Sequence, residues 1–207
     1  MITRLTRVSL IAIAALLNAS GAIAQSAQQN AADVERLVRA LEIKVGSVVG
    51  EVGAGAGELS VAMAKAVGDT GRVFSNEVNK DRVRAIERAA ANAGLKHVTV
   101  VDGRPDATNF PAECCDAIFM RNVYHHFGDP PAMNASLLAS LKPGGRLAII
   151  DFTPPPGGEA QPGGRGEDNH HGVTAPTLER ELRAAGFEIV STETTDRTVF
   201  VVARRPS

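Results

Sequence analysis

The mature part of the chain alternates short apolar runs with longer amphipathic runs. The apolar runs are rich in β-branched residues and predict strands at 47–52, 72–77, 98–101, 116–120, 147–152, 187–192 and 198–203. Helical spacing of apolar residues predicts helices at 33–41, 58–67, 80–93, 131–141 and 174–185. Such alternation predicts an α/β fold with a parallel sheet covered on both faces. The last two strands are joined around Thr195-Asp196 and predict a terminal antiparallel hairpin.

The first 24 residues have the pattern of an export signal. Arg4 and Arg7 give a basic start, residues 8–17 are apolar, and Ala22-Ile23-Ala24 fits the small-x-small cleavage pattern. The apolar stretch is shorter than the roughly 20 residues of a membrane span. We therefore expect cleavage before Gln25 and a periplasmic or secreted protein with no stable membrane span. An uncleaved N-terminal membrane anchor is the alternative.

The rest of the chain has the length of one domain. Residues 25–31 are Gln, Ala, Ser and Asn and predict a disordered leader, which together with a helix capped by Asp33 fills 25–43. The single domain is expected at 44–204. Within it, residues 154–166 are rich in Pro and Gly and predict a mobile loop, whereas Lys142-Pro143-Gly144-Gly145 predicts a turn before the fifth strand.

Charge argues against polyanionic partners. The chain has 22 basic and 23 acidic residues. Removal of Arg4 and Arg7 leaves 20 against 23, a net charge of −3. This balance does not favour nucleic acid or an anionic membrane surface as a partner. Trp is absent and Tyr124 is the one tyrosine, so the sequence offers no aromatic platform for single strands. Nothing in the pattern indicates the oligomeric state.

The two cysteines, Cys114 and Cys115, are adjacent. They can form a vicinal disulfide in an oxidising compartment, or enter a strand on alternate faces as reduced thiols. We favour the reduced pair. Two adjacent thiols alone do not make a tetrahedral metal site.

The most specific motif is Glu51-Val52-Gly53-Ala54-Gly55-Ala56-Gly57, between the first predicted strand and the first helix after it. A strand, a glycine turn and a helix bring backbone N–H groups against a nucleotide-like ligand. A dinucleotide fingerprint needs a glycine at position 58, but Glu58 stands there, and a carboxylate is unfavourable beside a pyrophosphate. The acid-x-Gly-x-Gly-x-Gly pattern resembles motif I of the class I S-adenosylmethionine (SAM)-dependent methyltransferases.

This resemblance covers about residues 33–204 and carries several expectations. It implies a single-domain, Rossmann-like, seven-stranded methyltransferase sheet, mostly parallel with a C-terminal antiparallel hairpin, and SAM as cofactor. By the same resemblance Gly53, Gly55 and Gly57 contact the methionine and ribose portion of SAM, and Glu51 supports its ammonium end. Most members have Asp in place of Glu51.

Further cofactor contacts are expected after the next strands. Glu77 ends the second strand, where an acid can accept both ribose hydroxyls, and the resemblance gives Val78 an apolar contact with adenine. After the third strand the register of the family selects Asp106 and Ala107 as the adenine-contacting pair, with Asp102 as the less favoured choice. Arg121, at the end of the fourth strand, is also a cofactor-binding candidate.

The histidines point to the reaction itself. Many small-molecule members of the family have a His after the fourth strand, which selects Tyr124, His125 and His126 as residues that orient or deprotonate the methyl acceptor. His170 and His171 follow the neighbouring fifth strand, so both pairs are expected at one mouth of the sheet. Two other interpretations stay open: a metal site that includes Asp168, and solvated loop histidines. Our preferred assignment has no metal.

The sequence is thus identified as a member of the class I SAM-dependent methyltransferases, acting on a small-molecule acceptor under the loop at 154–172. The first alternative is a non-catalytic exported protein of the same fold, because SAM is made in the cytosol. The second is a nicotinamide-dependent oxidoreductase, which Glu58, the Pro-Gly-Gly turn and the lack of a Tyr-x-x-x-Lys pair disfavour.

Overall fold

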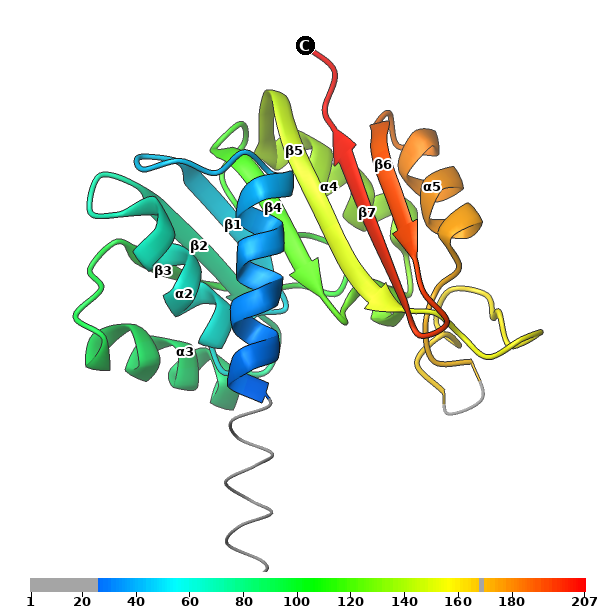
Figure 1. Ribbon diagram of the computed structural model, residues 1–207, viewed down its shortest axis with the longest axis horizontal. Coiled ribbons are helices and arrows are strands. Elements are labelled where there is room, and N and C mark those ends of the chain that lie inside the picture. Colours follow the sequence, from blue (N-terminus) through cyan, green and yellow to red (C-terminus); the bar gives the residue numbers. More distant parts are fainter. Residues whose placement is uncertain (1–25, 168–169) are drawn as a thin grey trace, which may run out of the picture.

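The computed structural model describes residues 26–167 and 170–207. Within these residues one seven-stranded sheet runs in the order β3-β2-β1-β4-β5-β7-β6 (Figure 1). Its strands are β1 (Val48–Val52), β2 (Arg72–Glu77), β3 (Val98–Asp102), β4 (Cys115–Arg121), β5 (Leu141–Phe152), β6 (Glu188–Thr194) and β7 (Thr198–Arg204). The helices are one over 26–40, α2 (Glu58–Val67), α3 (Lys80–Asn92), the 3-10 turn η1 (Tyr124–His126), α4 (Pro130–Ser140) and α5 (Ala175–Ala184).

The predicted α/β architecture and the terminal hairpin are confirmed. Strands β1 to β5 pair in parallel, whereas β7 lies antiparallel between β5 and β6. This is the mostly parallel sheet of the class I methyltransferase fold. The boundaries of α2 to α5 differ from the expected ones by at most one residue. Caps explain where three of these helices begin, because the side chains of Asn79, Asp129 and Thr174 accept N–H groups of the first turns of α3, α4 and α5.

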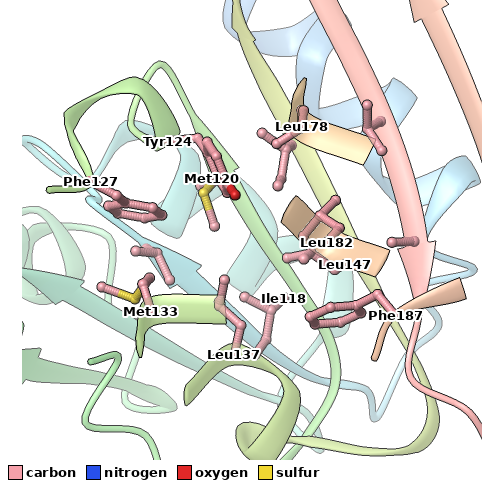
Figure 2. Packing of buried hydrophobic residues seen from close by; sticks show 14 of the residues in the cluster. Ile118, Met120, Tyr124, Phe127, Met133, Leu137, Leu147, Leu178, Leu182 and Phe187 are labelled. Carbon is pink, nitrogen blue, oxygen red and sulfur yellow. The ribbon is translucent and has the colours of Figure 1, made fainter. Parts of the chain in front are cut away.

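Alternation along the central strands divides the core between the two faces of the sheet. Ala117 and Phe119 face the side that the helix over 26–40 and α2 cover, where they pack with Leu37, Leu41, Leu59, Met63 and Val67. Ile118 and Met120 face the opposite side, where they pack with residues of α4, α5 and η1: Tyr124, Met133, Leu137, Leu178 and Leu182 (Figure 2). Both faces are therefore covered, which accounts for the nearly continuous apolar character of β4.

The N-terminal helix corrects one expectation. The segment predicted as a disordered leader is helical from residue 26, and Asp33 lies within the helix rather than at its N-cap. Tertiary contacts stabilise the polar first turns: Gln29 donates to Asp33, which is paired with Arg121 on β4, and Arg36 lies over the ring of Phe200. The proposed export signal, residues 1–24, lies outside the described residues. Within the described ranges no helix has the length and apolarity to cross a membrane.

The start of β5 also differs from the prediction. The strand begins at Leu141 rather than at 147, and the expected turn at 142–145 is a bulge inside it, because Cys115 pairs with Leu141 while Ala117 already pairs with Arg146. Glycine is required there. Gly144 has a φ of 76°, and a Cβ on Gly145 would lie 2.8 Å from the carbonyl oxygen of Lys142.

The cysteine prediction was wrong. Cys114 and Cys115 form a vicinal disulfide at the N-terminal end of β4. Cys114 precedes β4, which begins at Cys115, so the alternation of side chains within a strand does not separate the two cysteines. The loop predicted at 154–166 forms turns outside any helix or strand.

The close packing of β1 generates a stability prediction. A Cβ on Gly50 would lie 2.7 Å from the ring of Phe110 and 3.1 Å from Ile118, so Gly50→Ala is expected to destabilise the fold by about 1–3 kcal/mol. Gly128→Ala is the matched control, because nothing lies within 4 Å of its Cβ position. Chemical denaturation measures both, and equal stability of the two variants would contradict the packing argument.

Candidate functional site

A cavity of about 720 Å³ opens at the carboxyl ends of β1, β2 and β4. β1 continues into α2 on one face of the sheet, and β4 continues through η1 into α4 on the other, so the loops after these adjacent strands diverge. In doubly wound sheets this reversal of strand order is where ligands bind. The cavity is lined mainly by the glycine loop, the end of β2 and the segment after β4: Glu51–Ala56, Glu58, Leu59, Asn76–Val78, Arg82, Arg104, Pro105, Arg121–Val123, His126, Phe127 and Met133.

The glycine loop lines the cavity with backbone. Gly53 and Gly55 have φ angles of 69° and 59°, in the left-handed region that favours glycine. A Cβ on Gly53 would lie 2.5 Å from Val123, whereas nothing lies within 4 Å of the Cβ position of Gly55. The loop is fixed from β2, because the N–H groups of Gly53 and Gly55 donate to the side chains of Asn76 and Glu77 at 3.0 Å. Open backbone at Gly55 is the feature that a close-lying ligand requires.

Glu51 is a buried carboxylate in the wall of the cavity. Its side chain is 3% exposed and accepts a hydrogen bond from Ser60, whose own hydroxyl accepts one from Ser75. Burial raises the pKa of Glu51 to about 8, although the Ser60 hydroxyl and the charge of Arg121 act in the opposite direction. A cationic group placed beside this carboxylate would favour its ionised form, so the position suits a ligand with an ammonium group.

Glu77 and Val78 lie where the sequence predicted, at the end of β2. One carboxylate oxygen of Glu77 accepts the N–H of Gly55, and the other accepts the N–H groups of Val78 and Asn79. Each oxygen has more than one lone pair, so the carboxylate can accept ligand hydroxyls as well. Val78 is 60% exposed, an apolar side chain open to the cavity.

Arg121 connects the cavity to the N-terminal helix. Its Nη1 donates to the Asn30 side chain at 2.6 Å and to Asp33 at 2.9 Å. The guanidinium also lies close enough to Glu51 to favour the ionised form of that carboxylate. Sequence reasoning selected Arg121 but not its partners, because no local pattern links residues 88 or more positions apart.

Five of the predicted site residues do not line the cavity: Gly57, Asp106, Ala107, Tyr124 and His125. Gly57 precedes α2, where a Cβ would lie 3.1 Å from the backbone of Ile86. Asp106 turns away and pairs with Arg104, whose hydrogen bond lowers the pKa of the carboxyl. Arg104 and Pro105, the two residues before Asp106, line the cavity instead.

Tyr124 is a core residue. Its side chain is fully buried, lies with its ring tilted against that of Phe127 and is beside Met120 in the core (Figure 2). The hydroxyl donates to Glu181 at 2.9 Å and accepts from Asn134 at 2.8 Å. Burial, followed by the charge of Glu181, raises the pKa of Tyr124 far above its usual range. These contacts give the hydroxyl a structural role and leave it no access to the cavity.

Three of the four paired histidines lie together, as the sequence predicted, and the fourth does not. The ring centroids of His126 and His171 lie 3.9 Å and 4.4 Å from that of His125, but His170 turns away to the carbonyl of Gly158. His126 lines the cavity, and burial together with the charge of His125 lowers its pKa. His125 lies behind it, 1% exposed, with Nδ1 2.6 Å from a carboxylate oxygen of Asp151.

Sequence reasoning missed Asp151, although a signal for it was present. Asp151 follows the apolar run at 147–150 near the end of β5, much as Glu51 and Glu77 stand near the ends of β1 and β2. Sequence reasoning also missed Asn76, whose side chain accepts the N–H of Gly53, because no motif marks this residue. Among the residues that the structure describes, no group of three His, Cys, Asp or Glu side chains is arranged to hold a metal ion, and Asp168 lies outside them.

Comparison with known proteins agrees with this geometry. Residues 23–192 match the family model described as a methyltransferase domain, and the chain belongs to that family. A SAM-dependent methyltransferase from Aquifex aeolicus has the same fold, with a TM-score of 0.72, 26% identity and coverage of 84% of this chain and 89% of that one. The [4+2]-cyclase SpnF superposes with a TM-score of 0.74 at 18% identity, covering 84% and 80%, which shows the fold alone.

Among curated proteins, the chain is similar to the ubiquinone/menaquinone biosynthesis C-methyltransferase UbiE of Marinomonas sp. (strain MWYL1). The two are 29% identical over 114 residues, which are 55% of this chain and 45% of the relative. The match therefore spans less than half the length of that relative.

The raised pKa of Glu51 predicts a pH dependence of stability. Between the ordinary value of 4.5 and about 8, the folded protein keeps a proton that the unfolded chain has lost. The free energy of unfolding therefore falls as pH rises through this window, by up to about 1.4 kcal/mol per pH unit from this group. Glu51→Gln removes that contribution, and denaturation from pH 5 to 8 measures the slope.

Asp69→Asn is the matched control, since it neutralises an exposed carboxylate that does not line the cavity. The control is expected to keep the wild-type slope. Equal slopes in wild type and Glu51→Gln would show that the carboxyl ionises freely in the folded protein.

Proposed function

We propose that this protein is a class I SAM-dependent methyltransferase that transfers a methyl group to a small-molecule acceptor. The observation that carries the proposal is the cavity at the reversal of strand order, walled by open glycine backbone and by two buried carboxylates. Family membership and the SAM-dependent relative from Aquifex aeolicus support it. Exposed Glu58 at the same cavity disfavours a nicotinamide dinucleotide, whose pyrophosphate it would repel.

The cavity residues fit the chemical groups of SAM one by one. Glu51 suits the α-ammonium, Glu77 the ribose hydroxyls and Val78 the adenine ring, and the guanidinium of Arg121 suits the carboxylate of the methionine portion. SAM supplies an activated methyl group on a sulfonium. The task of the protein is to hold the acceptor in line with that methyl group, and such alignment alone accounts for several kcal/mol of a barrier.

The acceptor side is formed by the segment after β4 and by α4. Val123, His126, Phe127 and Met133 line the cavity there. These side chains are apolar or aromatic, in contrast to the acids and arginines at the cofactor end. A small and largely apolar acceptor is therefore favoured over a polyanion.

Calorimetric titration of the purified protein with SAM, S-adenosylhomocysteine (SAH) and NAD tests the proposal. Micromolar binding of SAM and SAH without a response to NAD is the expected result. A folded protein that binds neither SAM nor SAH would overturn the proposal and leave a non-catalytic binding protein of the same fold.

A variant pair refines the test. Val78→Ala removes apolar surface from the expected adenine contact and should weaken SAM binding by about 1 kcal/mol, or about fivefold in Kd. Val45→Ala is the control, because Val45 is 75% exposed and does not line the cavity. Similar Kd values for the two variants would remove Val78 from the cofactor site.

We also propose that residues 1–24 direct export and are removed, so that the mature protein begins at Gln25. The basic start, the apolar run and the Ala-x-Ala pattern support this proposal. Expression in a bacterial host, followed by fractionation and intact mass analysis, tests it. We expect a periplasmic or secreted product that begins at Gln25. A full-length product in the cytosolic fraction would contradict export, and a full-length product in the membrane fraction would indicate an uncleaved anchor.

A further inference from the structure

The first turns of the N-terminal helix lie at the carboxyl edge of the sheet (Figure 1). Asn30 and Asp33 are three positions apart there, so their side chains share one face of the helix. That face contacts Arg121, the last residue of β4. Nη1 of Arg121 donates to Oδ1 of Asn30 at 2.6 Å and to Oδ2 of Asp33 at 2.9 Å. The helix therefore holds the guanidinium through one of its three nitrogens.

Asp33 is a buried acid in the middle of a helix, a position where an unpaired carboxylate would be costly. Its side chain lies within a residue that is 7% exposed, and both of its oxygens have partners. Oδ1 accepts the amide of Gln29 at 2.9 Å, and Oδ2 accepts Nη1 of Arg121. The ion pair with Arg121 offsets the charge of the buried acid, and in return it restricts the arginine side chain.

One edge of the Arg121 guanidinium is left over. The helix uses only the N–H groups of Nη1. In the part of the chain that the structure describes, the N–H groups of Nε and Nη2 make no hydrogen bond. These two nitrogens form one side of the planar group, and such an edge matches the two oxygens of a carboxylate. Arg121 lines the cavity, so the carboxylate that fits is one brought by a ligand.

The charged neighbour of Arg121 indicates which end of a ligand belongs here. Glu51 lines the same cavity and lies close enough to Arg121 to be affected by its charge. A carboxylate that can pair with an ammonium, next to a guanidinium that can pair with a carboxylate, matches the two charges of an α-amino acid. The amino-acid end of SAM carries both groups.

The fixed position of the guanidinium affects how much this contact contributes to binding. A free arginine side chain loses rotamer freedom when it binds a ligand, and that loss weakens the affinity. Asn30 and Asp33 restrict Arg121 before the ligand arrives, which raises affinity without any new contact. Neither residue lines the cavity, so the helix acts on the ligand through Arg121.

We propose that Asp33, together with Asn30, is a positioning residue of the cofactor site: it fixes Arg121 so that the Nε–Nη2 edge binds the carboxylate of the methionine portion of SAM. This inference rests on the proposed methyl-transfer function. Its consequence is selectivity for adenosine derivatives that carry a complete amino-acid end. That selectivity depends on a helix that does not itself touch the ligand.

Two ligands that differ in one group test the inference. SAH has both the ammonium and the carboxylate, whereas decarboxylated SAH keeps the ammonium and lacks the carboxylate. The wild-type protein is expected to bind SAH at least about tenfold more tightly, as a hydrogen-bonded pair of charged groups provides. Calorimetric titration measures both Kd values.

Variants connect this difference to the helix. Asp33→Ala should raise the Kd for SAH about five- to tenfold and leave the Kd for decarboxylated SAH within about twofold. Adding Asn30→Asp to Asp33→Ala returns a carboxylate to the same Nη1 atom and should restore most of the selectivity. Glu35→Ala is the matched control, because it removes an exposed acid of the same helix whose partner is Arg39. It should behave as wild type.

A second measurement needs no variant of the helix. Nitrogen-15 NMR of arginine-labelled protein, with the Nε–H signal of Arg121 assigned from Arg121→Lys, reports on the free edge directly. The signal should shift and exchange more slowly with solvent in the SAH complex, but not in the complex with decarboxylated SAH. An unchanged signal at saturating SAH would overturn the inference, even where Asp33→Ala fails to fold.

The binding data separate this inference from the proposed function. Equal losses of affinity for both ligands in Asp33→Ala, or no loss for either, would overturn the positioning role, because that role acts on the carboxylate contact alone. Equal affinities of the wild-type protein for the two ligands would also overturn it and leave the proposed function intact. A folded wild-type protein that binds neither ligand would overturn the proposed function, and this inference with it.

Discussion

The reversal of strand order between β1 and β4 is the constraint on which the rest of the structure depends. β1 pairs with β2 on one side and with β4 on the other, and the chains that leave β1 and β4 go to opposite faces of the sheet. Two adjacent parallel strands thus end with no loop crossing between them. The cavity exists because of this divergence, and each residue assigned to the site reaches it from the end of a strand or the segment that follows.

The carboxyl edge of the sheet concentrates buried acids. Glu51, Glu77 and Asp151 lie at the last or next-to-last position of three different strands, and each is at most 5% exposed. Their environments separate their roles: Glu77 and Asp151 accept backbone N–H groups, whereas Glu51 has the Ser60 hydroxyl and an elevated pKa. A carboxylate that is costly to ionise in the ligand-free protein becomes favourable once a cation lies beside it. Burial of these acids therefore makes the carboxyl edge of the sheet selective for cationic groups of a ligand.

The N-terminal helix connects this edge to the far side of the sheet. Its polar residues Asn30 and Asp33 hold Arg121, and its apolar residues cover the strands that the other helices of that face leave open. Both faces of β4 are consequently buried. The guanidinium of Arg121, at the end of β4, is oriented by the N-terminal helix. The position of Arg121 at the cofactor end of the cavity therefore depends on the packing of the first helix.

The sequence by itself determined the order of strands and helices, the parallel sheet with its terminal hairpin, and the glycine loop with Glu51, Glu77, Val78 and Arg121. Those features are encoded by local periodicity, turn residues and motif spacing, which act within a few residues. Tertiary structure decided the remainder: the helical leader, the bulge at 142–145, the burial of Tyr124, the pairing of Asp106 with Arg104, and the Asp151–His125 pair. Each depends on which side chain meets which across strands and loops, and such contacts leave no periodic trace in the chain.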